Sequence, residues 1–183
     1  MKFTPTDIEG VWLIEPVRHA DSRGYFCETF RSDEFRAATG IVPDFVQENE
    51  SESTFGVVRG LHFQAGDAAQ AKLVRVAVGT IVDVAVDLRP ASPTFGRHIA
   101  VELSHENGRQ LYIPRGFAHG FAVLSPRARF LYKVDNYYCP AAERTLRFDD
   151  PSVAVKWPVE PDKMILSPKD MKGLSLDELD IEA

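Results

Sequence analysis

The chain has 183 residues, of which 44% are hydrophobic and 26% are charged. These proportions are those of an ordinary globular protein and exclude a disordered chain, and the length predicts a single domain over residues 1–183. The net charge of −6 comes without a basic stripe, so no nucleic-acid partner is expected. An anionic ligand would therefore need a local cluster of arginine and lysine side chains.

Cysteine usage and the N-terminal residues predict a cytoplasmic protein. Cys27 and Cys139 lack the spacing of a metal or redox motif, so we expect two buried free thiols in a reducing compartment. Residues 1–16 lack the basic start and apolar core of a signal peptide. No apolar run approaches the length that spans a membrane, so no membrane partner is expected.

The first 40 residues predict one strand and one helix. Residues 25–30 are rich in aromatic side chains and typical of a strand. Ser32 is expected to cap a short helix that continues through Ala38 and that Gly40 ends.

From Phe45 onward the hydrophobic residues alternate with a period of two, as in strands. Residues 71–78 and 81–88 are separated only by Gly79-Thr80, which predicts a β-hairpin. Further short strands are expected at residues 98–103, 110–113, 118–123 and 129–134. This spacing favours an antiparallel sandwich or small barrel. The segments that begin at Ser167 and Ser175 resemble helix starts and predict short peripheral helices.

The segment Arg59-Gly60-Leu61-His62-Phe63-Gln64 is the first candidate for chemistry. Apolar residues separate its polar ones, so the polar side chains should share one face of a strand. Arginine suits a phosphate oxygen, and histidine suits proton transfer near neutral pH. The segment therefore predicts a phosphorylated substrate and proton chemistry on that substrate.

A second histidine, His119, follows a tight turn in a Pro-x-Gly-x-x-His pattern that recurs in cupin barrels, where the histidine often binds a metal. A cupin metal site also needs a His-x-His pair and a carboxylate in the earlier half of the barrel. Here His62 is followed by Phe63 and Gln64, so two histidines at most are available where three or four ligands are needed. We therefore expect no metal, which disfavours a metal-dependent oxygenase.

Aromatic residues complete the candidate site. Tyr132 lies on an alternating strand, where its hydroxyl can point into a barrel and donate a proton. Tyr138 and Phe26 offer ring faces on which a nucleobase can stack.

Taken together, these segments resemble the dTDP-4-dehydrorhamnose 3,5-epimerase family, the RmlC-like cupins. Eight segments match in order along nearly the whole chain: Arg23-Gly24-x-Phe26-x-Glu28, Val46-Gln47-x-Asn49, Arg59 to Gln64, Lys72 to Arg75, Asp83 to Asp87, Ser92 to Gly96, Pro114 to Phe121, and Asn136-Tyr137-Tyr138. The resemblance implies an all-β antiparallel jelly roll and an enzyme without metal or cofactor. It also implies a homodimer that acts on a dTDP-linked 4-keto-6-deoxyhexose.

The resemblance also implies roles for individual residues. His62 would remove a proton from the sugar, Asp170 would fix its tautomer, Tyr132 would return a proton to the opposite face, and Lys72 would stabilise the enolate oxygen. Arg59 and Arg23 match positions that hold the diphosphate, and Arg23 would reach across from a partner subunit. Further positions match nucleotide or sugar contacts: Phe26, Glu28, Gln47, Asn49, His119, Tyr138, Glu143 and Lys169. Glu48, Glu50 and Ala65 depart from the family pattern as we know it.

Several alternatives remain open on the sequence alone. The protein could invert C3 only, catalyse 3,4-ketoisomerisation, or bind a nucleotide sugar without catalysis. Asp170 lies three residues after Ser167 and could be the acidic partner of a capping box. Asp83 and Asp87 would face the barrel interior, where Arg75 or Lys72 could pair with them.

Overall fold

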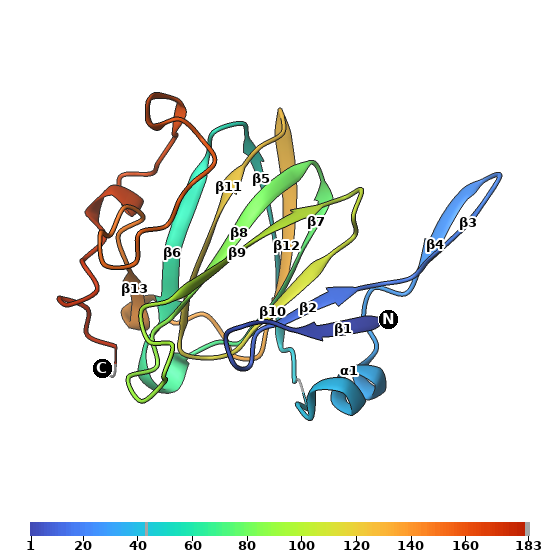
Figure 1. Cartoon of the computed structure of the whole chain (residues 1–183), viewed down its shortest axis with the longest axis horizontal. Helices are drawn as coiled ribbons and strands as arrows, with labels where there is room; N and C mark the ends of the chain where they lie inside the picture. The colour runs from blue at the N-terminus through green and yellow to red at the C-terminus, as the bar shows by residue number, and fades with distance from the viewer. Residues whose placement is uncertain (43, 182–183) are drawn as a thin grey trace.

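Two antiparallel sheets pack face to face in the computed structural model, which describes residues 1–42 and 44–181 (Figure 1). The six-stranded sheet has the order β1 (Lys2–Pro5), β2 (Trp12–Glu15), β10 (Gln110–Ile113), β7 (Lys72–Val78), β12 (Arg127–Val134) and β5 (Gln47–Thr54). The five-stranded sheet has the order β13 (Glu143–Thr145), β6 (Val58–Gln64), β11 (Phe117–Val123), β8 (Thr80–Asp87) and β9 (His98–Ser104). The arrangement is a cupin-type jelly roll and confirms the predicted fold class.

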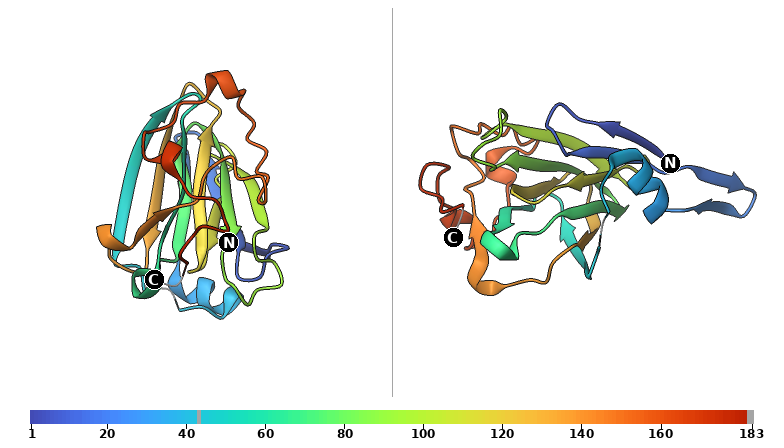
Figure 2. Two further views of the ribbon diagram at one scale, coloured as in Figure 1. Left: turned by 90° about the vertical axis from the view of Figure 1, so that its left-hand side faces the viewer. Right: turned by 90° about the horizontal axis from the view of Figure 1, so that it is seen from below.

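The main core lies between the two sheets and is built from the inward side chains of both. Val74 and Val76 of β7 meet Ile81 of β8 and Phe121 of β11, and all four are at most 5% exposed. A second cluster covers the outer face of the five-stranded sheet, where Leu176 and Leu179 of the C-terminal segment pack on it. Figure 2 shows this segment running along that sheet. Strand β11 is consequently buried on both faces at every position, His119 included.

The predicted hairpin between residues 71–78 and 81–88 is wrong. Strand β7 pairs with β10 and β12, whereas β8 pairs with β9 and β11 in the other sheet. Gly79 has a φ of +82°, and a Cβ there would lie 2.1 Å from the Arg127 carbonyl oxygen. A two-residue glycine link allows the chain to change direction, but here it carries the chain from one sheet to the other.

Helices are few and short, as predicted. Helix α1 (Ser32–Thr39) buries Phe35 against the outer face of the six-stranded sheet and ends at Gly40. Its N-cap is Arg31, without a side-chain cap, so the predicted Ser32 cap is wrong. The 3₁₀ turns are η1 (Gly66–Ala68), η2 (Pro140–Ala142), η3 (Pro161–Lys163) and η4 (Asp170–Lys172). The segment after Ser175 forms turns rather than the predicted helix.

An arm formed by β3 (Arg18–Asp21) and β4 (Gly24–Cys27) projects from the body of the molecule (Figure 1). These two strands pair with each other and belong to neither large sheet. On the arm, the side chains of Tyr25 and Phe26 are 60% and 71% exposed. The predicted free thiols are present, but Cys27 and Cys139 are each only partly buried. In the described part of the chain, no helix is long and apolar enough to cross a membrane.

Candidate active site

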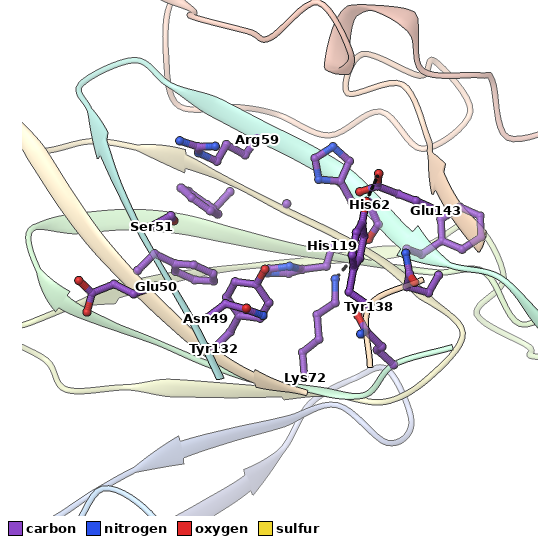
Figure 3. A pocket seen from close by; sticks show the side chains of 16 residues that line it. Asn49, Glu50, Ser51, Arg59, His62, Lys72, His119, Tyr132, Tyr138 and Glu143 are labelled. Atoms are coloured by element: carbon purple, nitrogen blue, oxygen red, sulfur yellow. Dashed lines mark hydrogen bonds between the residues drawn. The ribbon is translucent and has the colours of Figure 1, made fainter. Parts of the chain in front are cut away.

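A cavity of about 370 Å³ opens between the two sheets (Figure 3). From the five-stranded sheet it is lined by Arg59 and His62 of β6 and His119 of β11. From the six-stranded sheet it is lined by Lys72 of β7, Tyr132 of β12 and Asn49 of β5. A molecule bound here would therefore have histidines on one side and the tyrosine on the other.

The backbone brings the two histidines together. His62 and His119 lie directly opposite each other in the antiparallel pairing of β6 with β11. A Cβ on Gly60 would lie 2.6 Å from the carbonyl oxygen of His119, and one on Gly120 would lie 2.4 Å from that of Arg59. The two glycines thus allow a close approach of the strands that any side chain would prevent.

His62 is hydrogen-bonded to Asp170, which the C-terminal segment brings to β6. The Nε2 atom of His62 lies 2.6 Å from Oδ1 of Asp170, whose other oxygen accepts a hydrogen bond from the Ser167 hydroxyl at 2.6 Å. Burial alone would raise the pKa of Asp170, but the hydrogen bonds from His62 and Ser167 outweigh it and lower the pKa to about 2. The ionised carboxylate therefore accepts the Nε2 proton of His62, which leaves the lone pair of Nδ1 available to act as a base.

His119 forms a second histidine–aspartate pair, deeper in the core. Its Nε2 atom donates to Oδ2 of Asp83 at 2.9 Å, and the two side chains are 7% and 0% exposed. Burial lowers the pKa of His119, against the opposing effect of Asp83. The prediction that Asp83 pairs with Arg75 or Lys72 is wrong, because the strand register places His119 within reach of it. The prediction for Asp87 is wrong too, since Asp87 bonds to Arg89, Ser92 and Thr94 after the end of β8.

Lys72 crosses the cavity from the six-stranded sheet. Its Nζ atom lies 3.4 Å from the carbonyl oxygen of His62, and the residue is 8% exposed. Burial lowers the pKa of Lys72 to about 8, although the negative charges of Asp83 and Glu143 favour the protonated form. A cation so placed can stabilise negative charge that develops on a molecule in the cavity.

Tyr132 lies directly across from Asn49 in the pairing of β12 with β5, and both side chains line the cavity. Burial raises the pKa of Tyr132, and a hydrogen bond with Asn49 acts in the opposite direction. The amide of Gln47 donates to Oδ1 of Asn49 at 2.9 Å. Tyr132 is therefore protonated at neutral pH and held by its neighbours as a potential proton donor.

The mouth of the cavity carries Tyr138, Glu143 and Lys169. The Tyr138 hydroxyl donates to Glu143 at 3.0 Å, and this bond raises the pKa of the phenol. Lys169 forms an ion pair with the same carboxylate. Tyr138 is 49% exposed, so one face of its ring is open to a planar ligand.

Most of the predicted site residues thus converge on one cavity or its rim, from β5, β6, β7, β11, β12 and the C-terminal segment. The structure does not bring Arg23, Phe26 and Glu28 to this cavity. Arg23 and Phe26 lie on the projecting arm, and Glu28 follows it directly. Among the described residues, no group of three or more histidine, cysteine, aspartate or glutamate side chains could hold a metal ion.

Sequence reasoning included Gln64 in the candidate segment but gave it no role at the site. Its Oε1 accepts the backbone N–H of Cys139 at 2.7 Å and so holds the loop that carries Tyr138. Gln64 also lines the cavity. The signal for it was present, because Gln64 lies two residues after His62 and therefore on the same face of the strand.

The fold and the cavity define the class of protein, a cupin barrel with histidine, lysine and tyrosine side chains placed for acid–base chemistry. Comparisons with known sequences identify the family. A family model described as dTDP-4-dehydrorhamnose 3,5-epimerase matches residues 5–178. An enzyme of that name from Shigella flexneri is 49% identical over 173 residues, which cover 94% of each chain.

Solved structures agree with the sequence comparisons. The dTDP-4-dehydrorhamnose 3,5-epimerase of Elizabethkingia anophelis superposes with a TM-score of 0.93, at 46% identity and with 97% of each chain covered. The dTDP-6-deoxy-D-glucose-3,5-epimerase of Legionella pneumophila, solved in complex with dTDP-4-keto-L-rhamnose, gives a TM-score of 0.94 at 45% identity, covering 98% of this chain and 94% of that one. The chain therefore belongs to the dTDP-4-dehydrorhamnose 3,5-epimerase family and is an isomerase.

Proposed function

We propose that the protein converts dTDP-4-dehydro-6-deoxy-D-glucose to dTDP-4-dehydro-L-rhamnose by inverting both C3 and C5, in the cytoplasm and without a cofactor. The observation that carries this proposal is the placement of His62 and Tyr132 on opposite sheets, both facing one cavity. Inversion of a carbon requires a proton to leave one face of the sugar and another to arrive at the opposite face. Two groups on the same side of a cavity would return the proton to the face it left.

The 4-ketone of the substrate makes the hydrogens on C3 and C5 acidic. Nδ1 of His62 takes the proton, and the electrons of the C–H bond move onto the ketone oxygen to give an enolate. Asp170 stabilises the imidazolium that forms, and Lys72 stabilises the enolate oxygen. Tyr132 then donates its proton to the opposite face of the same carbon, and exchange with water restores both groups before the second inversion. Each proton-transfer partner contributes roughly 10²–10⁴-fold in rate.

The remaining residues of the cavity hold the nucleotide in this proposal. Arg59 keeps an exposed guanidinium above the cavity while its Nε bonds to Ser53 at 3.0 Å, so its other nitrogens can contact the diphosphate. Tyr138 stacks on the thymine ring at the cavity mouth. The further contacts to nucleotide and sugar come from Gln47, Asn49, His119, Glu143 and Lys169.

We propose in addition that the protein is a homodimer in which the arm of one subunit reaches the cavity of the other. The arm carries Arg23 and the exposed ring of Phe26, and neither lies at the cavity of its own chain. Strand β5, which lines the cavity, forms an edge of its sheet and so leaves room for a neighbour. Light scattering tests the dimer. Mixing R23A and H62A subunits tests the exchange of arms, because mixed dimers regain one complete site only if the arm acts across subunits.

Proton NMR of dTDP-4-keto-6-deoxyglucose incubated with the enzyme in D₂O tests the reaction itself. Deuterium at both C3 and C5, with formation of the L-rhamno product, is the expected result. Label at C3 alone would replace the proposal with a C3-only epimerase, and label at neither carbon would refute proton abstraction from this substrate.

A further inference from the structure

The C-terminal segment contains the pattern Ser-x-x-acid twice, at Ser167–Asp170 and at Ser175–Glu178. In the second copy the carboxylate of Glu178 accepts the backbone N–H of Ser175 at 3.1 Å, which is the bond expected of a capping box. In the first copy Asp170 accepts no bond from the Ser167 backbone. The Ser167 hydroxyl donates to Oδ2 of Asp170 at 2.6 Å and accepts the Asp170 backbone N–H at 3.2 Å.

The Ser167 hydroxyl bonds to Oδ2 only, so the other carboxylate oxygen of Asp170, Oδ1, faces β6. Oδ1 accepts from Nε2 of His62 at 2.6 Å and from the backbone N–H of Gly60 at 3.3 Å. Ser167 therefore bonds to the oxygen that His62 does not use. The two bonds to Ser167 fix both the side chain and the backbone of Asp170, so the carboxylate has one orientation toward the imidazole.

The bond that the Ser167 hydroxyl accepts from the Asp170 N–H is typical of an N-cap residue, but the bond that the hydroxyl donates to Oδ2 of Asp170 is not a capping bond. The turn η4 that follows has three residues, and its N-cap is Lys169, which forms no side-chain cap. The segment is already held on both sides by backbone pairing of Val57 with Ile165 and of Leu146 with Leu174. These pairings fix the path of the chain, but they leave the rotation of the Asp170 side chain to its own hydrogen bonds.

We propose that Ser167 is a positioning residue for proton abstraction, which acts by holding the Asp170 carboxylate against Nε2 of His62. This inference rests on the proposed function, because it assigns Ser167 to the base of that reaction. Ser167 does not line the cavity, so it acts through Asp170 and not on the substrate. Ser167 is exposed, so a substitution there leaves no void in the core.

The test compares S167T with S167V, two branched side chains of similar size that differ in the hydroxyl. Two rates and one constant are measured: the rate of deuterium wash-in at C3 in D₂O, and kcat and KM for dTDP-4-keto-6-deoxyglucose. We expect S167V to lower kcat and wash-in together by about tenfold, the effect of losing one hydrogen bond to a charged group, with KM changed less than about twofold. S167T should keep both rates within about threefold of the wild type.

Two controls separate positioning from a general effect on the C-terminal segment. S175A removes the matching hydroxyl of the second copy. That hydroxyl bonds to Glu178 and not to Asp170 or His62, so the variant should leave kcat unchanged. In a D170N background S167V should have no further effect on wash-in. Ser167 acts on His62 through the Asp170 carboxylate, and D170N has already replaced that carboxylate. Thermal unfolding of each variant reports the structural contribution separately.

The inference is overturned if S167V exchanges protons as fast as S167T, or if S175A lowers kcat as much as S167V. It is also overturned if S167V lowers wash-in by the same factor with and without D170N. The wild type distinguishes these failures from failure of the proposed function: absence of wash-in by the wild type refutes the function, whereas wild-type wash-in that S167V leaves unchanged refutes only the role of Ser167.

Discussion

The cavity contains two histidine–aspartate pairs that are close to each other yet differ in surroundings. His62 and His119 face each other across neighbouring strands, and each directs Nε2 at a carboxylate oxygen less than 3 Å away. The side chain of His62 is 29% exposed, whereas that of His119 is 7% exposed. Asp170 accepts two further hydrogen bonds, from Ser167 and Gly60, but Oδ1 of Asp83 is buried without a hydrogen-bond partner among the described residues.

This difference indicates how the same pair of residue types takes two roles. The carboxylate of Asp170 is stabilised as an anion from several sides, so it can support positive charge on an imidazole that is open to the cavity. The pair of His119 with Asp83 is fully desolvated, and burial lowers the pKa of His119 and opposes a proton there. This contrast supports the proposal that His62 abstracts the proton and that His119 gives structural support and contacts the substrate.

The largest expected effect is that of H62A on turnover. The variant removes the base but keeps the backbone carbonyl to which Lys72 bonds, so we expect kcat to fall about 10³-fold. Asp170 retains its bonds to Ser167 and Gly60, and the free energy of unfolding should change by less than about 1 kcal/mol. Steady-state kinetics and urea unfolding measure the two quantities. Retention of more than a tenth of the wild-type kcat would show that His62 is not the base.

For H119A we expect the reverse of H62A, a larger effect on the free energy of unfolding than on turnover. Removal of the imidazole leaves the buried Asp83 carboxylate without its donor, which should cost about 3 kcal/mol in the free energy of unfolding. The double variant D83V/H119A removes both partners and should recover most of that loss. If H119A proved as stable as H62A in urea, the contrast between the two pairs would be wrong.

The role of Lys72 can be tested through the pH dependence of activity and of stability. With a pKa of about 8, its cation is lost as the pH rises through that value, so kcat/KM should decline above about pH 8 in the free enzyme. K72R keeps its charge over this range and should move the decline to higher pH, whatever its absolute rate. Because the unfolded chain keeps the lysine proton up to about pH 10.5, stability should rise between pH 8 and 10.5 relative to K72M. An identical alkaline limb in the wild type and K72R would exclude this role.

The smallest expected effect concerns the acid stability of the Asp170 pair. The pKa of Asp170 is about 2 in the folded protein, against an ordinary value of 3.8, so the folded state binds fewer protons between these values. The contribution to stability is complete above about pH 4 and is lost as the pH falls through 2. Acid unfolding of D170N should therefore be less steep over that interval than unfolding of the wild type. Parallel curves would contradict the strong anchoring of this carboxylate.

The local part of the site was predictable from sequence. Arg59 lies three positions before His62 and reaches the same cavity because the pairing of β6 with β11 shifts register between them. Alternation in β6 places His62 and Gln64 on one face of the strand, and alternation in β12 turns Tyr132 inward. These predictions need only the geometry of a strand. The number of short alternating segments likewise predicts an antiparallel barrel or sandwich before any pairing is known.

The long-range part was not predictable from local pattern. His62 and Asp170 are 108 positions apart, and only the family resemblance linked them. The partner of Asp83 depends on the register of β8 against β11, which alternation does not determine. The same limit produced the wrong hairpin, because the apolar runs of β7 and β8 pair equally well with strands from distant parts of the chain.

The central claim is that His62 and Tyr132 work from opposite faces of one carbon, and Y132F tests it most directly. Deuterium wash-in at C3 and formation of inverted product are followed together by proton NMR in D₂O. We expect wash-in to persist, because His62 still removes the proton and returns deuterium to the same face, while inversion falls at least about 10²-fold relative to wash-in. Equal losses of wash-in and inversion, or no loss of either, would contradict the assignment of Tyr132 as the proton donor on the opposite face.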